Sequence, residues 1–146
     1  MAMEMWVLSD RELGSVAEWQ AAIDAEGYPL QLSSQVQLKT HWGFLPAHLR
    51  GKLTGFEWGP SPADEFLQET RQEWTDVGLS HDWKFVRGFR WIGDYNELKA
   101  AWMAAVAYAS ATGGVIIDDQ EPLVRTAAEG RLVVSQLERD IAREQD

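Results

Sequence analysis

Cysteine is absent from this chain of 146 residues. Its absence excludes a disulfide-stapled scaffold, a catalytic thiol and any metal site built on thiolates. No apolar run approaches the roughly 20 residues that a membrane-spanning helix needs. The first five residues also lack the basic segment and apolar stretch of an export signal. These absences lead us to expect a cytoplasmic protein that does not bind membranes.

Basic residues are scarce, because 13 lysines and arginines stand against 23 acidic residues, for a net charge of −10. Nucleic-acid binding needs clustered bases to neutralise phosphates, so the composition argues against a nucleic-acid partner. The acids concentrate between residues 64 and 82, where Arg71 is the only lysine or arginine. Such a block is typical of a solvated face that maintains solubility. It is also typical of a surface that steers a basic protein partner into place.

Helix-start signals divide the chain into regular elements. Ser15 with Glu18, and Asp94 with Glu97, have the spacing of capping boxes, and Ser61-Pro62 is a cap followed by proline. Apolar residues at helical spacing follow each of these signals and another at Thr126. The predicted helices occupy residues 15–27, 61–78 and 94–112 and a segment that starts at 126.

Short apolar or alternating runs predict the strands. The expected strands are residues 5–8, 29–32, 54–58, 83–92 and 115–117, with 36–38 continuing or pairing with the second, and a turn at 43–46. A chain of this length fits one domain. We therefore predict a single α+β domain over residues 1–146, with a mixed, mainly antiparallel sheet of about five strands and helices packed on it.

Tryptophan is abundant, with eight residues spread over the whole chain. Most lie on the predicted apolar faces, which is typical of core packing. Trp42 and Trp58 differ because they flank predicted turns, beside Gly43 and Gly59-Pro60. Exposed tryptophan is enriched at binding hot spots. These two residues therefore predict a surface for a partner or a ligand.

Two groups of residues raise the alternative of an enzyme. His81 and Asp82 are the residue types of a general base and the carboxylate that orients it, but no serine is placed as a nucleophile. Asp118, Asp119 and Glu121 follow a predicted buried strand, where carboxylates suit Mg²⁺ binding or general-base chemistry. They equally suit a solvated turn before Pro122. A small hydrolase or metal-dependent enzyme is thus an alternative, although we expect no catalytic residue, metal or cofactor.

Three stretches together resemble a known kind of protein. They are residues 7–10 running into 15–19 and 26–32, then residues 43–57, then residues 111–120 with Thr-Gly-Gly before an apolar strand and Asp-x-Gln. Their order resembles small acidic bacterial proteins encoded beside toxins, including immunity proteins of type VI secretion and polymorphic toxin systems. The resemblance implies a protein that binds and neutralises a cognate toxin, commonly by covering its active site. It assigns no functional residue.

The leading hypothesis is therefore an immunity-type inhibitor whose acidic side chains meet a basic cleft of the toxin, with aromatic anchors at the centre. The predicted contact residues are Asp64, Glu65, Glu69, Glu73, Asp76, Asp118, Asp119, Glu121, Trp42 and Trp58. A further alternative is a structural or regulatory homodimer that pairs through the surface around Trp42 and Trp58. Divalent-ion titration separates the enzyme alternative from the others, and the mass in solution separates the homodimer.

Overall fold

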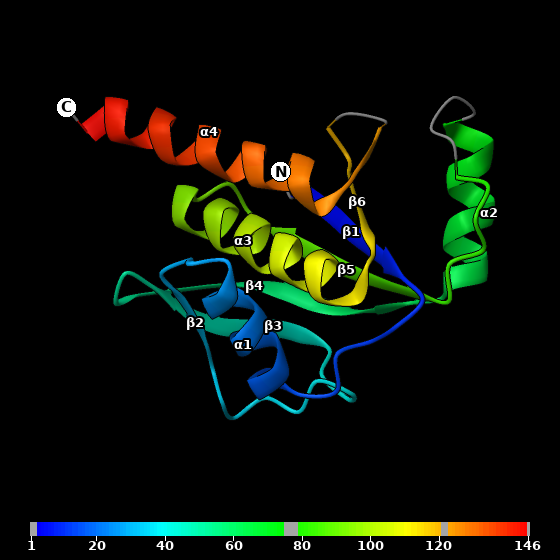
Figure 1. The fold of residues 1–146 in the computed structure, drawn as a ribbon, viewed down its shortest axis with the longest axis horizontal. Coiled ribbons are helices and arrows are strands. Elements are labelled where there is room, and N and C mark those ends of the chain that lie inside the picture. The colour runs from blue at the N-terminus through cyan, green and yellow to red at the C-terminus, as the bar shows by residue number, and fades with distance from the viewer. Residues whose placement is uncertain (1–2, 75–78, 121–122, 146) are drawn as a thin grey trace.

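The backbone of residues 3–74, 79–120 and 123–145, which the computed structural model describes, contains one seven-stranded antiparallel sheet. The strands are β1 (Met3–Ser9), β2 (Leu30–Leu32), β3 (Gly43–Leu49), β4 (Lys52–Ser61), β5 (Phe85–Trp91), β6 (Val115–Asp118) and β7 (Val124–Arg125). Their order across the sheet is β2-β3-β4-β5-β1-β6-β7, so β1 lies inside the sheet between β5 and β6 (Figure 1). The predicted α+β class is confirmed, with seven strands instead of about five.

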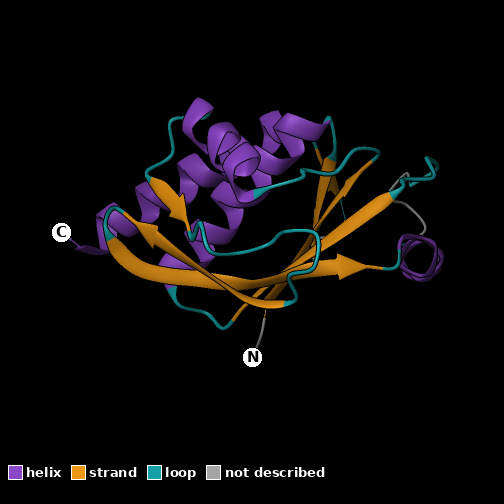
Figure 2. Ribbon diagram, turned by 90° about the horizontal axis from the view of Figure 1, so that it is seen from below, coloured by secondary structure: helices purple, strands orange, loops and turns teal. Residues whose placement is uncertain are grey.

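The helices are distributed unequally over the two faces of the sheet. They are α1 (Val16–Ala25), α2 (Ala63–Glu73), α3 (Tyr95–Thr112) and α4 (Ala127–Gln145). Helices α1, α3 and α4 cover one face, whereas α2 stands apart at one end of the sheet (Figures 1 and 2). Most of the second face of the sheet is therefore not covered by a helix. Among the described residues, no helix combines the length and apolarity needed to cross a bilayer.

Strand β3 corrects the prediction of a turn at residues 43–46. Leu45, Ala47 and Leu49 are buried and alternate with exposed neighbours, which is the period of a strand. Pro46 is tolerated because β2 pairs only with residues 47–49 of β3, so the ladder needs no amide hydrogen from it. The predicted strand at 36–38 is also wrong, since those residues lie in the loop between β2 and β3.

The start of α2 also differs slightly from its prediction. Ser61 is the last residue of β4, and Pro62 occupies the capping position without a side-chain hydrogen bond. The helix ends at Glu73, and the predicted stop at Gly78 lies outside the described residues. Leu67 of α2 packs with Leu8, Val86 and Ile117, which point to the face opposite the main core. Helix α2 thus covers one end of the second face.

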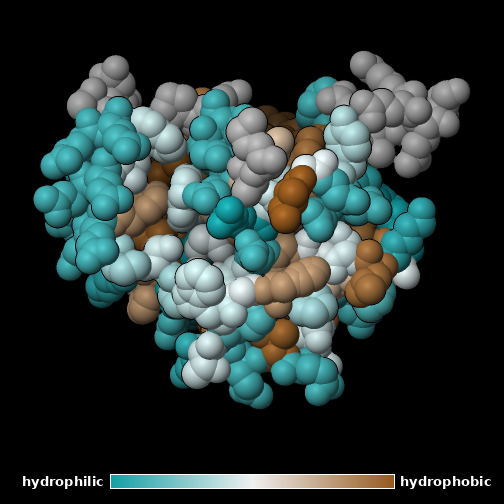
Figure 3. All heavy atoms as spheres, turned by 180° about the vertical axis from the view of Figure 1, so that it is seen from behind, coloured by the Kyte–Doolittle hydropathy of each residue, from teal (hydrophilic) through white to brown (hydrophobic). Residues whose placement is uncertain are grey.

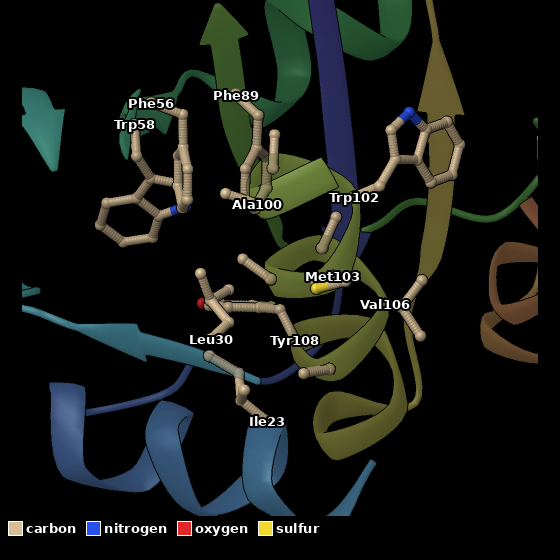
Figure 4. Packing of buried hydrophobic residues seen from close by; sticks show 14 of the residues in the cluster. Ile23, Leu30, Phe56, Trp58, Phe89, Ala100, Trp102, Met103, Val106 and Tyr108 are labelled. Carbon is tan, nitrogen blue, oxygen red and sulfur yellow. The ribbon is translucent and has the colours of Figure 1, made fainter. Parts of the chain in front are cut away.

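The main core lies between the sheet and helices α1 and α3 (Figure 4). Helix α3 is buried from Lys99 to Ala109, and its many alanines let it approach the strands closely. Trp19 of α1 is fully buried, and its Nε1 donates a hydrogen bond to the Ala104 carbonyl oxygen at 2.9 Å. Its ring contacts the rings of Phe56, Trp58, Phe89 and Tyr108, at centroid distances of 5.1–6.3 Å.

Glutamates paired with bases join α4 and α1 to their neighbours. The carboxylate of Glu138 accepts from Arg50 at 2.6 Å and from the buried Lys99 at 3.4 Å. Burial raises the pKa of Glu138, but the hydrogen bond from Arg50 and the charge of Lys99 hold it below the ordinary 4.5. Arg131 donates two hydrogen bonds to Glu26, which lower the pKa of that carboxyl below 4.5 as well.

These lowered pKa values predict a loss of stability in acid. The unfolded chain takes up protons at Glu26 and Glu138 near pH 4.5, before the folded chain does. Their contribution is therefore present above about pH 4.5 and is lost as the pH falls through the folded pKa values. Urea unfolding measured from pH 7 to pH 3 should show this decline. In the Glu26→Gln variant the decline should be shallower, and an unchanged slope would exclude Glu26 as a contributor.

Candidate functional site

A row of four residues crosses the uncovered face of the sheet. Trp6 of β1 is in register with Gly88 of β5, and Gly88 is in register with Gly59 of β4. The row ends at Trp42, which precedes β3 and lies against Gly59. Two tryptophans thus flank a floor of two glycines. We call this depression the indole trough.

The Trp42 ring lies close to Gly59, whereas the Trp6 ring lies at ordinary contact distance from the Cβ position of Gly88. A Cβ on Gly59 would stand 3.2 Å from Cδ1 of Trp42, and a Cβ on Gly88 would stand 3.6 Å from Cδ1 of Trp6. Glycine inside a strand often marks the close approach of another group to the backbone. Here the strands carry no side chain between the two rings. The cavity they leave has a volume of about 220 Å³.

The two tryptophans of the trough differ in exposure. Trp42 is 79% exposed, the highest value among the exposed large hydrophobic residues of the described chain. Trp6 is half-buried and packs against Phe66 of α2, with ring centroids 5.1 Å apart. One end of the trough therefore joins α2, and the other end is open to solvent. Figure 3 shows this side of the molecule, where pale and brown surface lies between hydrophilic margins.

Charged residues form one long side of the trough. Glu4, Arg90 and Glu57 are register partners on β1, β5 and β4, two residues along each strand from the central row. All three line the cavity. The ion pair between Arg90 Nε and Glu57 Oε2 is long, at 3.8 Å, and both side chains are more than half exposed. This side therefore has two carboxylates and one loosely paired guanidinium.

Helix α2 supplies the predicted acidic surface next to the trough. Asp64, Glu65, Glu69 and Glu73 are all exposed. Asp76 lies outside the described residues. The single base of the helix, Arg71, donates to the carbonyl oxygens of Leu79 and His81 and to Asp82. Because Arg71 is held against the neighbouring loop, the solvent face of α2 is acidic.

Asp118 does not offer a carboxylate to a partner. Its side chain is buried, accepts from Arg125 Nη1 at 2.5 Å and accepts from the backbone N–H of Gln120. A carboxylate placed at the end of a buried strand needs such a cation, so the prediction of Asp118 as a contact residue is wrong. Asp119 is exposed and accepts from the Glu4 amide. Glu121 lies outside the described residues.

Trp58 is also not a surface residue. It is 3% exposed, because it alternates with Gly59 on β4 and points to the covered face. Its ring lies 5.1 Å from that of Trp19, inside the main core. The prediction of Trp58 as a partner contact is therefore wrong. The neighbouring Gly59 is the residue of that segment that belongs to the trough.

The histidines and acids form no recognisable catalytic centre in the described part of the chain. His81 pairs with Asp10 at 2.6 Å rather than with Asp82. His41 bonds to the Gly43 carbonyl oxygen and stacks near Trp58. No group of three or more histidine or acidic residues among the described residues is placed to hold a metal ion. The geometry therefore directs attention to binding surfaces.

Sequence reasoning identified Trp42 and the acids of α2 but missed the rest of the trough. Trp6 was assigned to the core with most other tryptophans, although it alternates with Met5 and Val7 and so points to the other face. The available signal was a pair of glycines, Gly59 and Gly88, each inside a strand.

Comparisons with protein families, with characterised proteins and with solved structures find no significant match to this chain.

Proposed function

We propose that this chain is an immunity-type protein, which binds a cognate bacterial toxin in the cytoplasm and covers its active site. The uncovered face of the sheet is the docking surface. Trp42 is the central anchor, and the exposed acids of α2 face the basic part of the toxin. The observation that carries the proposal is the exposed Trp42 ring held over Gly59 at the open end of the trough.

The two parts of this surface have different roles in binding. The net charge of −10 and the acids of α2 accelerate the encounter with a basic toxin, an effect that weakens as salt rises. Removal of the Trp42 ring from water then supplies affinity, because few aromatic anchors dominate most interfaces. Covering the catalytic cleft inhibits the toxin without any chemical step.

The test first identifies the partner and then measures the effect of replacing Trp42. Tagged protein is used to capture a partner from lysate of the native cell, and that partner is then expressed alone and together with this chain. We expect the partner to arrest growth alone and wild-type protein to restore it. Trp42→Ala should weaken the complex by roughly 30-fold or more, the effect of a hot-spot truncation of about 2 kcal/mol.

A matched control is available on the other side of the molecule. Leu132 is 71% exposed and belongs to α4, one of the helices on the opposite face of the sheet from the trough (Figure 1). Leu132→Ala should bind and protect like the wild type. Full protection by Trp42→Ala, or a partner that does not arrest growth, would contradict the proposed function.

A further inference from the structure

We propose that the indole trough receives an arginine side chain of the protein partner, with its guanidinium beside Trp42 and paired with the carboxylate of Glu57. This inference rests on the proposed function and adds the chemistry of the partner's central residue. Three properties of the trough carry it: its shape, its charge and the weakness of its internal ion pair.

The shape suits a flat group at the end of a long side chain. Trp6 lies on β1 and Trp42 directly precedes β3, with β5 and β4 between them, so their backbones are about 14 Å apart at the usual strand spacing. Gly88 and Gly59 place no side chain between the rings. The cavity of about 220 Å³ accommodates one large side chain and not a folded segment. A ligand group entering there passes along the face of an indole.

The charge of the trough favours a cation. Glu4 and Glu57 contribute two negative charges to the lining and Arg90 contributes one positive charge. Beyond Phe66, the exposed acids of α2 add further negative charge. An incoming apolar side chain would remove water from these carboxylates without replacing its hydrogen bonds, which is unfavourable. A cationic side chain replaces those bonds.

The internal ion pair leaves a carboxylate available. Arg90 approaches Glu57 through Nε at 3.8 Å, which is beyond hydrogen-bond distance. A partner guanidinium can form two parallel hydrogen bonds with the same carboxylate while Arg90 stays beside Glu4, its other register partner. The row Glu4–Arg90–Glu57 would then become an alternating row of four charges.

Arginine fits these conditions better than lysine. Its guanidinium is planar, stacks on tryptophan and binds a carboxylate with two donors at once. A lysine ammonium is compact and strongly hydrated, so it gains less from the ring. We therefore expect the indole trough to prefer arginine over lysine and over the neutral isostere citrulline.

The experiment uses the whole protein and small probes. Indole N–H signals in two-dimensional ¹H–¹⁵N spectra are assigned through Trp42→Phe and Trp6→Phe, and the protein is titrated with N-acetylarginine amide. We expect saturable shifts of the Trp42 and Trp6 signals, with none for the buried Trp19. N-acetylcitrulline amide and N-acetyllysine amide should bind at least several-fold more weakly. Glu57→Gln should weaken arginine binding strongly, whereas Glu65→Gln on α2, which removes only a more distant charge, should weaken it much less.

Each other outcome overturns the inference. Absence of a saturable shift up to about 100 mM probe excludes an arginine site. Equal binding of citrulline excludes a role for charge, and equal weakening by Glu65→Gln indicates diffuse attraction to the acidic helix. These results leave the proposed function intact if Trp42→Ala still abolishes protection. Conversely, saturable arginine binding with full protection by Trp42→Ala would retain the site and refute its role in inhibition.

Discussion

Replacing Trp19 by alanine should lower the free energy of unfolding by about 3–5 kcal/mol, as expected when a buried tryptophan is truncated. Trp19 is fully buried and has four aromatic neighbours, so the lost ring leaves a cavity that rigid neighbours cannot fill. Its hydrogen bond to the Ala104 carbonyl oxygen is also lost. Urea unfolding followed by circular dichroism measures the difference.

The chain contains its own control for this prediction. Trp42→Ala removes the same side chain from a site that is 79% exposed, so the free energy of unfolding should change by about 0.5 kcal/mol or less. The two variants should therefore separate folding from binding: the first loses stability, the second loses the partner. Equal losses of stability in both variants would show that Trp42 belongs to the folded core.

Filling the floor of the trough should block the partner while leaving the fold intact. A Cβ on Gly88 would meet Ser61 Oγ and Trp6 Cδ1 at 3.6 Å, an ordinary contact distance. Gly88→Ala should therefore maintain stability or raise it by about 0.4–1 kcal/mol, since alanine restricts the unfolded chain. The affinity for the partner should fall about tenfold, and further for Gly88→Val, because the added groups occupy space between the indoles.

Gly14→Ala is the matched control for this pair of variants. A Cβ at Gly14 would meet only Glu18 Oε1, at 3.8 Å, and the site is outside the trough. Its affinity for the partner should equal that of the wild type, by titration calorimetry. Unchanged binding in Gly88→Val would mean that the partner does not enter the trough.

Most of the fold followed from local signals. The capping residues Ser15 and Asp94 accept from the expected backbone amides, and the two helices end at Ala25 and Thr112, at or near the predicted ends at 27 and 112. The failure at β3 has a physical reason: glycine and proline favour turns locally, yet pairing with β4 over residues 43–49 outweighs that preference. Long-range pairing of this kind is not visible in a short window of sequence.

The site was less predictable, since it depends on which residues share a face. Trp58 and Gly59 are adjacent in sequence, but neighbouring residues of a strand face opposite sides of the sheet. Trp58 therefore lies in the core, whereas Gly59 lies next to Trp42. The sequence around Asp118 is typical of an exposed turn. Its ion pair with Arg125 forms only when the chain folds back on itself, so the burial of Asp118 is not visible in the local sequence. Helical periodicity, in contrast, was sufficient to place the acids of α2 on an exposed surface.

The interior position of β1 has a consequence for synthesis. The strand leaves the ribosome before its partners β5 and β6, which begin at residues 85 and 115. At typical translation rates of about 5–20 residues per second, the apolar run from Met5 to Leu8 is synthesised roughly 5–21 s before both of its neighbours exist. During that interval a nascent chain presents an unpaired hydrophobic strand. Efficient production should therefore depend on chaperones that shield this segment until α3 and β6 have been made.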